Sequence, residues 1–178
     1  ALAEETQKEN NFTHIYDVLR HGTPVVLFDR IAEELKCDKV IVDDFDSAVN
    51  ATQYLIDTNC KKIALFSTIH NLSVGELREN GYREALQNNN INFNKSITLL
   101  LDSDVGFEEK MSQIILDEKP DAIFAIDEYA VVTAMKFCLK NGLHVPDDVS
   151  IIGFADGLWS RRMTPSLSTI SQHAPEIG

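Results

Sequence analysis

Residues 121 to 154 read DAIFAIDEYAVVTAMKFCLKNGLHVPDDVSIIGF and contain two short apolar runs on either side of a longer segment. The runs Ala122–Ile126 and Ser150–Phe154 have the length and mainly apolar character of strands covered on both faces. Asn141-Gly142 is typical of a helix end, because glycine adopts the left-handed backbone conformation at little cost. The segment before it carries apolar side chains on one helical face, at Ala130, Ala134, Phe137 and Cys138. The stretch therefore predicts a strand–helix–strand unit of a parallel sheet.

The same alternation of short apolar runs and helical segments extends over most of the chain. Further strands are expected at Val25–Phe28, Val40–Val42, Ile63–Phe66, Ile97–Leu101 and Leu167–Ile170. Apolar side chains share one helical face in three more segments, at Phe12, Ile15, Tyr16 and Leu19, at Ala48, Ala51 and Leu55, and at Phe107, Met111, Ile114 and Ile115. This order of elements predicts an α/β protein with a parallel sheet.

The composition is that of a globular protein, because the chain has 178 residues and 44% of them are apolar. No stretch approaches the roughly 18 consecutive apolar residues of a membrane helix, and the acidic, polar Ala1–Asn11 does not resemble a secretory signal. A formal net charge of −12 would repel DNA phosphates, so this chain alone is not expected to bind DNA. Cys37, Cys60 and Cys138 lack C-x-x-C spacing, which argues against disulfides and zinc and favours a reducing cytoplasm.

Carboxylates follow the predicted strands, where the ligand crevice of a parallel sheet opens. These residues are Asp29, Asp43, Asp44, Asp102, Asp127 and Asp156. Carboxylate oxygens at such an edge suit a hydroxyl-rich or cationic ligand. The alternative is that an aspartate caps the next helix, which we favour for Asp46, Asp127 and Asp102. Asp29 precedes no clear helix, so a binding role there is at least as well supported.

No common catalytic motif is present in the sequence. It lacks G-x-G-x-x-G after a strand, G-x-x-x-x-G-K-[ST], H-E-x-x-H and G-x-S-x-G. We therefore expect no enzyme, no catalytic residue, no cofactor and no metal. A small α/β enzyme that uses the carboxylates as acid and base is the third hypothesis, behind two kinds of ligand-binding protein described next.

An ordered set of motifs resembles the lactose and purine repressor (LacI/GalR) family along almost the whole chain. Its most specific parts are VPDDVSIIGF at Val145–Phe154 and PSLSTI at Pro165–Ile170. The other segments are Pro24–Arg30, Val42–Asp44 with the helix Ala48–Leu55, Lys61–Leu65, Arg78–Leu86 and Asp121–Ala125. The resemblance implies the effector-binding core of a transcriptional repressor.

In fold, the resemblance implies a periplasmic-binding-protein-like α/β architecture: two doubly wound parallel-sheet subdomains, joined by crossover strands, with the effector between them. We expect residues 1–43 to be the remainder of the N-terminal subdomain, 44–160 the C-terminal subdomain, and 161–178 a crossover back toward the first. The family's DNA-binding helix-turn-helix, its opening β-α units and its closing segment are absent from this sequence. A family member would bind operator DNA through that helix-turn-helix, form a homodimer and sense a sugar or related metabolite in the cytoplasm, away from the membrane.

The alternative is a periplasmic sugar-binding protein of an ABC transporter, which shares the fold. The repressor-like Val-Pro-Asp-Asp-Val-Ser motif at 145–150 favours the regulator.

The resemblance also implies an effector site. Asp29 matches the acidic residue that often faces the effector, and Arg78, three residues before Gly81, matches the arginine that holds it. A planar guanidinium could bind a carboxylate or a sugar oxygen. Without the resemblance, Arg78 would be a solvated helix-face residue paired with Glu76 or Glu79.

The sequence departs from the family at two expected contacts. Many members have Asn-Asp where this chain has Ile126-Asp127, and Gly-Phe-Asp-Asp where it has Gly-Phe-Ala155-Asp156. Two polar effector contacts would then be lost, although Asp156 could replace one carboxylate. The expected effector-binding residues are Asp29, Arg78, Asp127 and Asp156. A loop with Trp159, Arg161 and Arg162 could stack on a ligand or anchor a partner, and a plain surface loop is the simpler interpretation.

Overall fold

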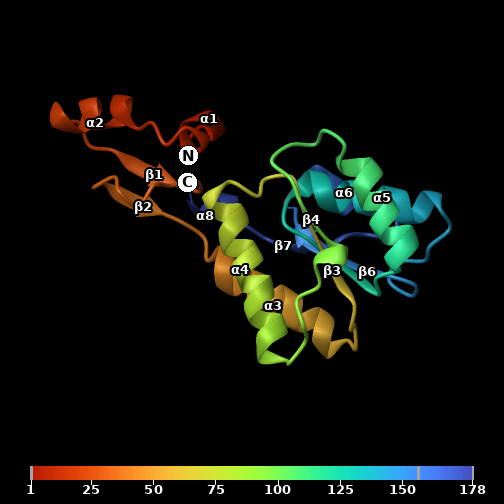
Figure 1. Cartoon of the computed structure of the whole chain (residues 1–178). Helices are drawn as coiled ribbons and strands as arrows, with labels where there is room; N and C mark the ends of the chain where they lie inside the picture. Colours follow the sequence, from red (N-terminus) through yellow and green to blue (C-terminus); the bar gives the residue numbers. More distant parts are fainter. Residues whose placement is uncertain (1, 156, 178) are drawn as a thin grey trace.

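A five-stranded parallel sheet forms the larger part of the protein in the computed structural model, which describes residues 2–155 and 157–177 (Figure 1). Its strands lie in the order β4-β3-β5-β6-β7, and all neighbours are parallel. Their bounds are β3 Ile63–Ser67, β4 Thr98–Leu100, β5 Ala122–Ala125, β6 Ser150–Phe154 and β7 Ser168–Ile170. The first strand in sequence, β3, lies in the second position. The chain then adds β4 at one edge, returns to place β5 on the other side of β3, and continues to β7 at the opposite edge, as in doubly wound sheets. The predicted parallel α/β fold is confirmed.

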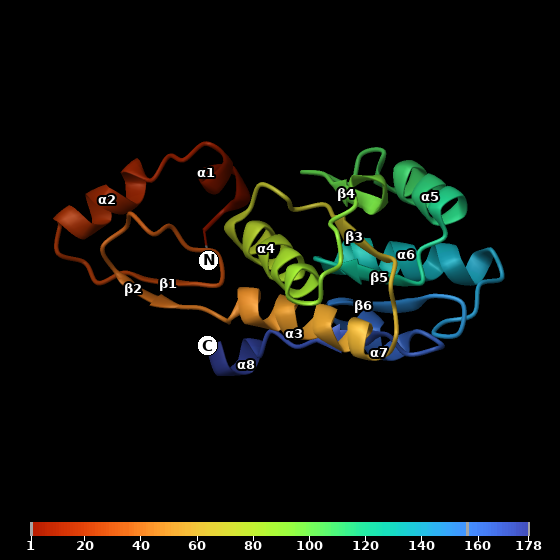
Figure 2. The same ribbon diagram turned by 60° about the horizontal axis from the view of Figure 1, so that its bottom comes forward.

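Helices cover both faces of this sheet, because each strand alternates its side chains between two apolar layers. Ala64, Phe66, Ile123, Ala125 and Ile151 pack under α5 (Phe107–Glu118) and α6 (Glu128–Lys140). On the opposite face, α3 (Asp44–Asp57) and α4 (Ser73–Asn88) pack on Ile63, Leu65, Ala122, Phe124, Ile152 and Phe154. Figure 2 shows these helices on the two sides of the sheet. A 3-10 turn, η1 (Lys95–Ile97), precedes β4, and α7 (Leu158–Arg162) lies between β6 and β7.

A smaller unit precedes α3 and has its own apolar centre. It contains α1 (Glu4–Lys8), α2 (Thr13–Arg20), β1 (Val26–Phe28) and β2 (Asp38–Val40). The two strands form a separate parallel sheet. Its buried apolar side chains are Leu2, Phe12, Leu27, Ala32 and Leu35.

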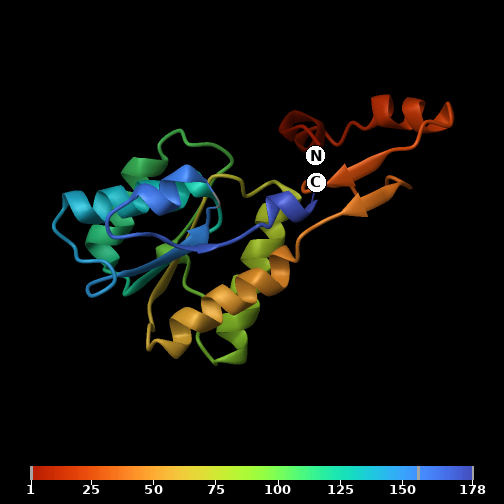
Figure 3. The ribbon, with the colours of Figure 1, turned by 180° about the vertical axis from the view of Figure 1, so that it is seen from behind.

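Two connections link the small unit to the large sheet. Residues 41–43 lead from β2 into α3, and residues 171–173 lead from β7 to α8 (Ala174–Ile177), next to β1 and β2. Figure 3 shows both connections on the side of the large sheet that faces the small unit.

The second predicted strand is displaced in the structure. Val40–Val42 was expected from its apolar residues, but β2 is Asp38–Val40, because pairing with β1 places Asp38 opposite Val26 and Val40 opposite Phe28. Ile41 and Val42 have left the sheet and line a cavity instead. Apolar character alone therefore placed this strand two residues too far along the chain.

Candidate functional site

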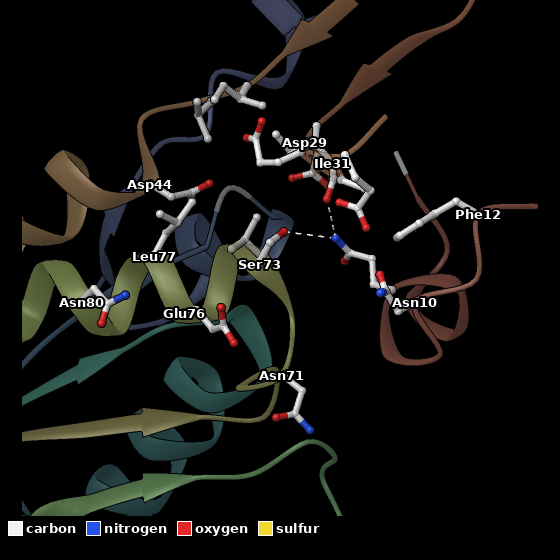
Figure 4. A pocket seen from close by; sticks show the side chains of 17 residues that line it. Asn10, Phe12, Asp29, Ile31, Asp44, Asn71, Ser73, Glu76, Leu77 and Asn80 are labelled. Atoms are coloured by element: carbon white, nitrogen blue, oxygen red, sulfur yellow. Dashed lines mark hydrogen bonds between the residues drawn. The ribbon is translucent and has the colours of Figure 1, made fainter. Parts of the chain in front are cut away.

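A cavity of about 410 Å³ lies between the small unit and the beginning of α4 (Figure 4). Its walls come from α1 and the residues after it, the loop after β1, the connection into α3, and the first turns of α4. The described lining residues are Gln7, Asn10, Phe12, Asp29, Ile31, Ala32, Glu33, Glu34, Ile41, Val42, Asp44, Asn71, Ser73, Val74, Glu76, Leu77 and Asn80. A volume of this size falls in the range of small-molecule sites.

The cavity wall is acidic and rich in amides. Its carboxylates are Asp29, Glu33, Glu34, Asp44 and Glu76, and none of the described lining residues is Lys, Arg or His. Cations behind the wall offset three of these charges: Arg30 lies 3.9 Å from Asp29, Lys39 lies 3.2 Å from Glu33, and Arg78 lies 2.7 Å from Asp44. The wall therefore keeps an excess of negative charge and of hydrogen-bond acceptors.

Asp29 reaches the cavity through an uncommon backbone conformation. It follows β1 directly and has φ 60°, in the left-handed region that aspartate tolerates better than most residues. Its backbone N–H donates to the Val40 carbonyl at 3.1 Å, which continues the β1–β2 pairing by one bond. Figure 4 shows its carboxylate at the cavity, where the sequence predicted a binding residue.

Gln7 connects the two sides of the cavity. Its side-chain amide donates to the Ile31 carbonyl at 2.9 Å within the small unit and to Ser73 Oγ at 3.1 Å at the start of α4. Its Oε1 is buried and accepts no hydrogen bond. Because a buried acceptor without a donor is costly, this oxygen is an unsatisfied polar atom within the cavity wall.

Arg78 lies beneath the wall rather than in the lining. Only 3% of the residue is exposed, and its Nε and Nη2 both contact Asp44 Oδ1 at 2.7 Å. Nη1 donates to the Ile126 carbonyl at 2.8 Å, Nη2 donates to Gln172 at 3.3 Å, and the guanidinium stacks 3.7 Å from the Phe154 ring centre. Each of the three guanidinium nitrogens thus has a partner inside the protein.

The alternative interpretation, in which Arg78 is a solvated helix-face residue paired with Glu76 or Glu79, is wrong. Glu79 instead pairs with Arg83 at 2.7 Å and lies 3.2 Å from His70 Nδ1. Arg78 is inside the protein because its position on α4 faces the sheet and α3, where Asp44 supplies the counter-charge.

Asp44 presents its second carboxylate oxygen to the cavity. The residue is 4% exposed, and both Arg78 contacts use Oδ1, which leaves Oδ2 without a hydrogen bond to a described residue. Figure 4 shows the carboxylate directed toward the open space near Asp29. Burial raises the pKa of Asp44 above its ordinary value, while Arg78 opposes that rise.

Asp127 closes the place where a doubly wound sheet commonly binds its ligand, between the carboxyl ends of β3 and β5. It is 8% exposed, caps α6 by accepting from Ala130 N at 2.9 Å, and accepts from Thr68 N and Oγ1 at 2.7 and 3.0 Å. The helix-capping interpretation of Asp127 is confirmed. The carboxylate is not part of the cavity lining among the described residues.

The capping predictions for Asp46 and Asp102 were wrong. Asp43 caps α3 by accepting from the N–H of Asp46, because the helix begins one turn earlier than its apolar face suggested. Asp102 accepts from Asn71 N at 3.0 Å and so holds the loop before α4, while Gly106 precedes α5.

Both departures from the repressor pattern are buried in the apolar layers. Ile126 is fully buried under α3 and α4, and Ala155 is buried on the opposite face with α5 and α6. Neither residue lines the cavity. Asp156 and the side chain of Trp159 lie outside the described residues, and Arg161 and Arg162 are exposed on α7.

Neither a metal centre nor a membrane span is found in the described part of the chain. No three His, Cys, Asp or Glu side chains among these residues are placed to hold a metal ion. None of the helices in residues 2–155 and 157–177 is long and apolar enough to cross a bilayer.

The curated proteins that resemble this chain include transcriptional repressors. The periplasmic binding protein-like domain matches residues 52–178. The probable HTH-type transcriptional repressor ExuR of Bacillus subtilis (strain 168) is 28% identical over 99% of this chain and 53% of the repressor. The HTH-type transcriptional repressor PurR of Histophilus somni (strain 129Pt) is 29% identical over 99% of this chain and 52% of its own length. The chain thus spans about half the length of these curated relatives.

Solved structures show the same relationship. A regulatory protein of the LacI family from Chloroflexus aggregans superimposes with a TM-score of 0.84 and 26% identity, over 94% of this chain and 61% of that protein. The transcription regulator CcpA of Lactococcus lactis gives a TM-score of 0.81 at 23% identity, over 94% and 62% of the two chains, and supports the fold.

Proposed function

The chain belongs to the periplasmic binding protein-like domain family, and from that premise we propose that it is the effector-binding part of a LacI-family transcriptional repressor. The observation that carries this proposal is the cavity of about 410 Å³ between two units linked by two chain connections. A small molecule held there contacts both units at once and therefore favours one relative orientation of them. Such a preference is what a coupling free energy between effector and DNA requires.

In this proposal the predicted site residues have different roles. Asp29 contacts the effector directly, since its carboxylate lies in the lining. Arg78 acts through Asp44, whose carboxylate it orients. Asp127 holds the loop after β3 and so supports the wall from behind. Asp156 belongs to the predicted set but lies outside the described residues.

DNA binding and dimerisation are proposed for the full-length protein. The formal net charge of −12 repels DNA phosphates, so operator contacts would come from a helix-turn-helix elsewhere in the protein. Residues 1–43 and 44–160 then act as the two subdomains, and 161–178 as the crossover. A homodimer working in the cytoplasm follows from the same role.

The relatives that the comparisons name are regulators, which favours the repressor over a solute-binding protein of a transporter. We also propose that the protein has no catalytic activity and releases its effector unchanged.

The test uses the full-length protein and a labelled DNA fragment from its own promoter. A thermal-shift screen of sugars, amino sugars, nucleobases and amino acids identifies ligands, because a molecule that binds only the folded state raises Tm. We expect at least one ligand to change the Kd for the DNA measured by fluorescence anisotropy. Asp29→Asn should reduce that change, whereas Glu108→Asn, at an exposed position of α5 outside the cavity, should not. Ligands that bind without altering DNA affinity would overturn the proposal.

A further inference from the structure

We propose that the ligand of this cavity is of monosaccharide size and carries a protonated amine together with hydroxyl groups. The inference rests on the proposed function and specifies the chemistry of the same site. The first observation is the charge of the wall: five carboxylates and no described Lys, Arg or His. Three of the carboxylates have a cation within 4 Å, so two negative charges, those of Glu34 and Glu76, have no described ion-pair partner.

The second observation is independent of the acidic count. Gln7 Oε1 in the cavity wall has no hydrogen-bond partner. Asp44, which is 4% exposed, gives Oδ1 to Arg78 and directs its carboxylate toward the open space (Figure 4). A buried acceptor is stabilised when a donor reaches it, and an ammonium group offers three. A ligand that brings N–H and O–H donors therefore suits a wall in which acceptors outnumber donors.

The nearby cation does not change this conclusion. Arg78 is the buried positive charge beneath the wall, but each of its side-chain nitrogens already contacts Asp44, Ile126 or Gln172, and one face of the guanidinium stacks on Phe154. An anionic ligand would have to displace these contacts before reaching the guanidinium, and it would meet Asp44 first. A bare divalent cation is also a poor occupant, because no three acidic side chains among the described residues are close enough to share one.

The experiment compares three sugars on one ring frame with the full-length protein: D-glucosamine, D-glucose and D-glucuronate, measured by isothermal titration calorimetry. We expect glucosamine to bind about tenfold more tightly than glucose, and glucuronate about tenfold more weakly, as for one ion pair in a partly buried site. Higher salt should weaken glucosamine binding and leave glucose unchanged. This order supports the inference.

Variants place the effect in the cavity. Glu76→Gln removes one wall charge from the exposed first turn of α4 and should lower the preference for glucosamine over glucose several-fold. Glu108→Gln removes a comparable charge from α5 outside the cavity and should leave the preference unchanged. Asp44→Asn keeps an acceptor for Arg78 and should abolish most of the preference. Should that variant fail to fold, Glu76→Gln still decides.

Equal or tighter binding of glucuronate, or failure of all three sugars to bind at 10 mM, would overturn the ligand class. Either result leaves the proposed function standing if another ligand from the wider screen changes the DNA affinity. Failure of every screened ligand to change that affinity would instead count against the proposed function.

Discussion

Replacing Arg78 with methionine would remove a buried positive charge while filling similar volume. In the structure the guanidinium supplies two contacts of 2.7 Å to Asp44 Oδ1 and one of 2.8 Å to the Ile126 carbonyl. Methionine supplies no donor, so the Asp44 carboxylate and this carbonyl would both stay buried without a partner. Breaking one side of a buried ion pair costs about 3–5 kcal/mol. We expect the free energy of unfolding at pH 7 to fall by that amount.

A double-mutant cycle separates the pair from the packing. Asp44→Asn in the Arg78→Met background removes the orphaned charge, so the double variant should be more stable than the sum of the two single changes by about 2 kcal/mol. Arg83→Met is the matched control, because Arg83 is also on α4 but is 41% exposed with its pair on Glu79. Its cost should stay below about 1 kcal/mol.

The loss of stability caused by Arg78→Met should become smaller as the pH falls. Burial already raises the pKa of Asp44 above 3.8, and Arg78 opposes the rise, so losing Arg78 raises the pKa further. A folded-state pKa above the unfolded one means that the folded protein takes up the proton first as pH falls. The penalty for the buried carboxylate is therefore relieved as pH drops through the raised pKa toward 3.8.

Urea denaturation followed by circular dichroism at pH 7 and pH 4.5 measures these quantities. The loss caused by Arg78→Met should be smaller at the lower pH. A loss below about 1 kcal/mol at pH 7, or additive effects in the cycle with no pH dependence, would refute the assignment of a coupled buried pair.

Three further outcomes are expected. Gly81→Ala should lower the free energy of unfolding by about 1–3 kcal/mol, because the new methyl would lie 2.4 Å from the Phe45 carbonyl oxygen and force α3 and α4 apart; an unchanged urea midpoint would contradict this close contact. Asp127→Ala should cost about 2–4 kcal/mol in the same assay, since it removes the α6 cap and both acceptors for Thr68, and a cost equal to that of Asp127→Asn would argue against it. Burial raises the pKa of the Cys138 thiol to about 11, so iodoacetamide at pH 8 should label it about a hundredfold more slowly in the folded protein than in urea, as read by mass spectrometry of the peptide.

Sequence reasoning located most of the sheet because its strands are buried on both faces. The bounds of β6 agree with the predicted Ser150–Phe154, and β3 and β5 differ by one residue at one end. The pattern of apolar residues did not predict α4 as a complete helix. Its buried face includes Gly75, Arg78 and Gly81, which are not apolar side chains, so the helical period is hidden in close backbone contacts and a buried charge.

The candidate site could be predicted only in part. Asp29 was found because no helix follows it, which left a binding role open. Gln7, Asp44 and Ser73 meet at the cavity only through the folding of distant segments, so no local pattern marks them together. Asp44 did follow a predicted strand, and its distance from Arg78 in sequence concealed their pairing in space.

The single guanidinium of Arg78 binds next to both chain connections, at Asp44 beside the first and at Gln172 within the second. One buried side chain therefore ties together the two points at which the chain passes between the units. Any change in the angle between the units that moved either connection would strain a contact of this guanidinium, whereas α2, at the far end of the small unit in Figure 1, lies away from it.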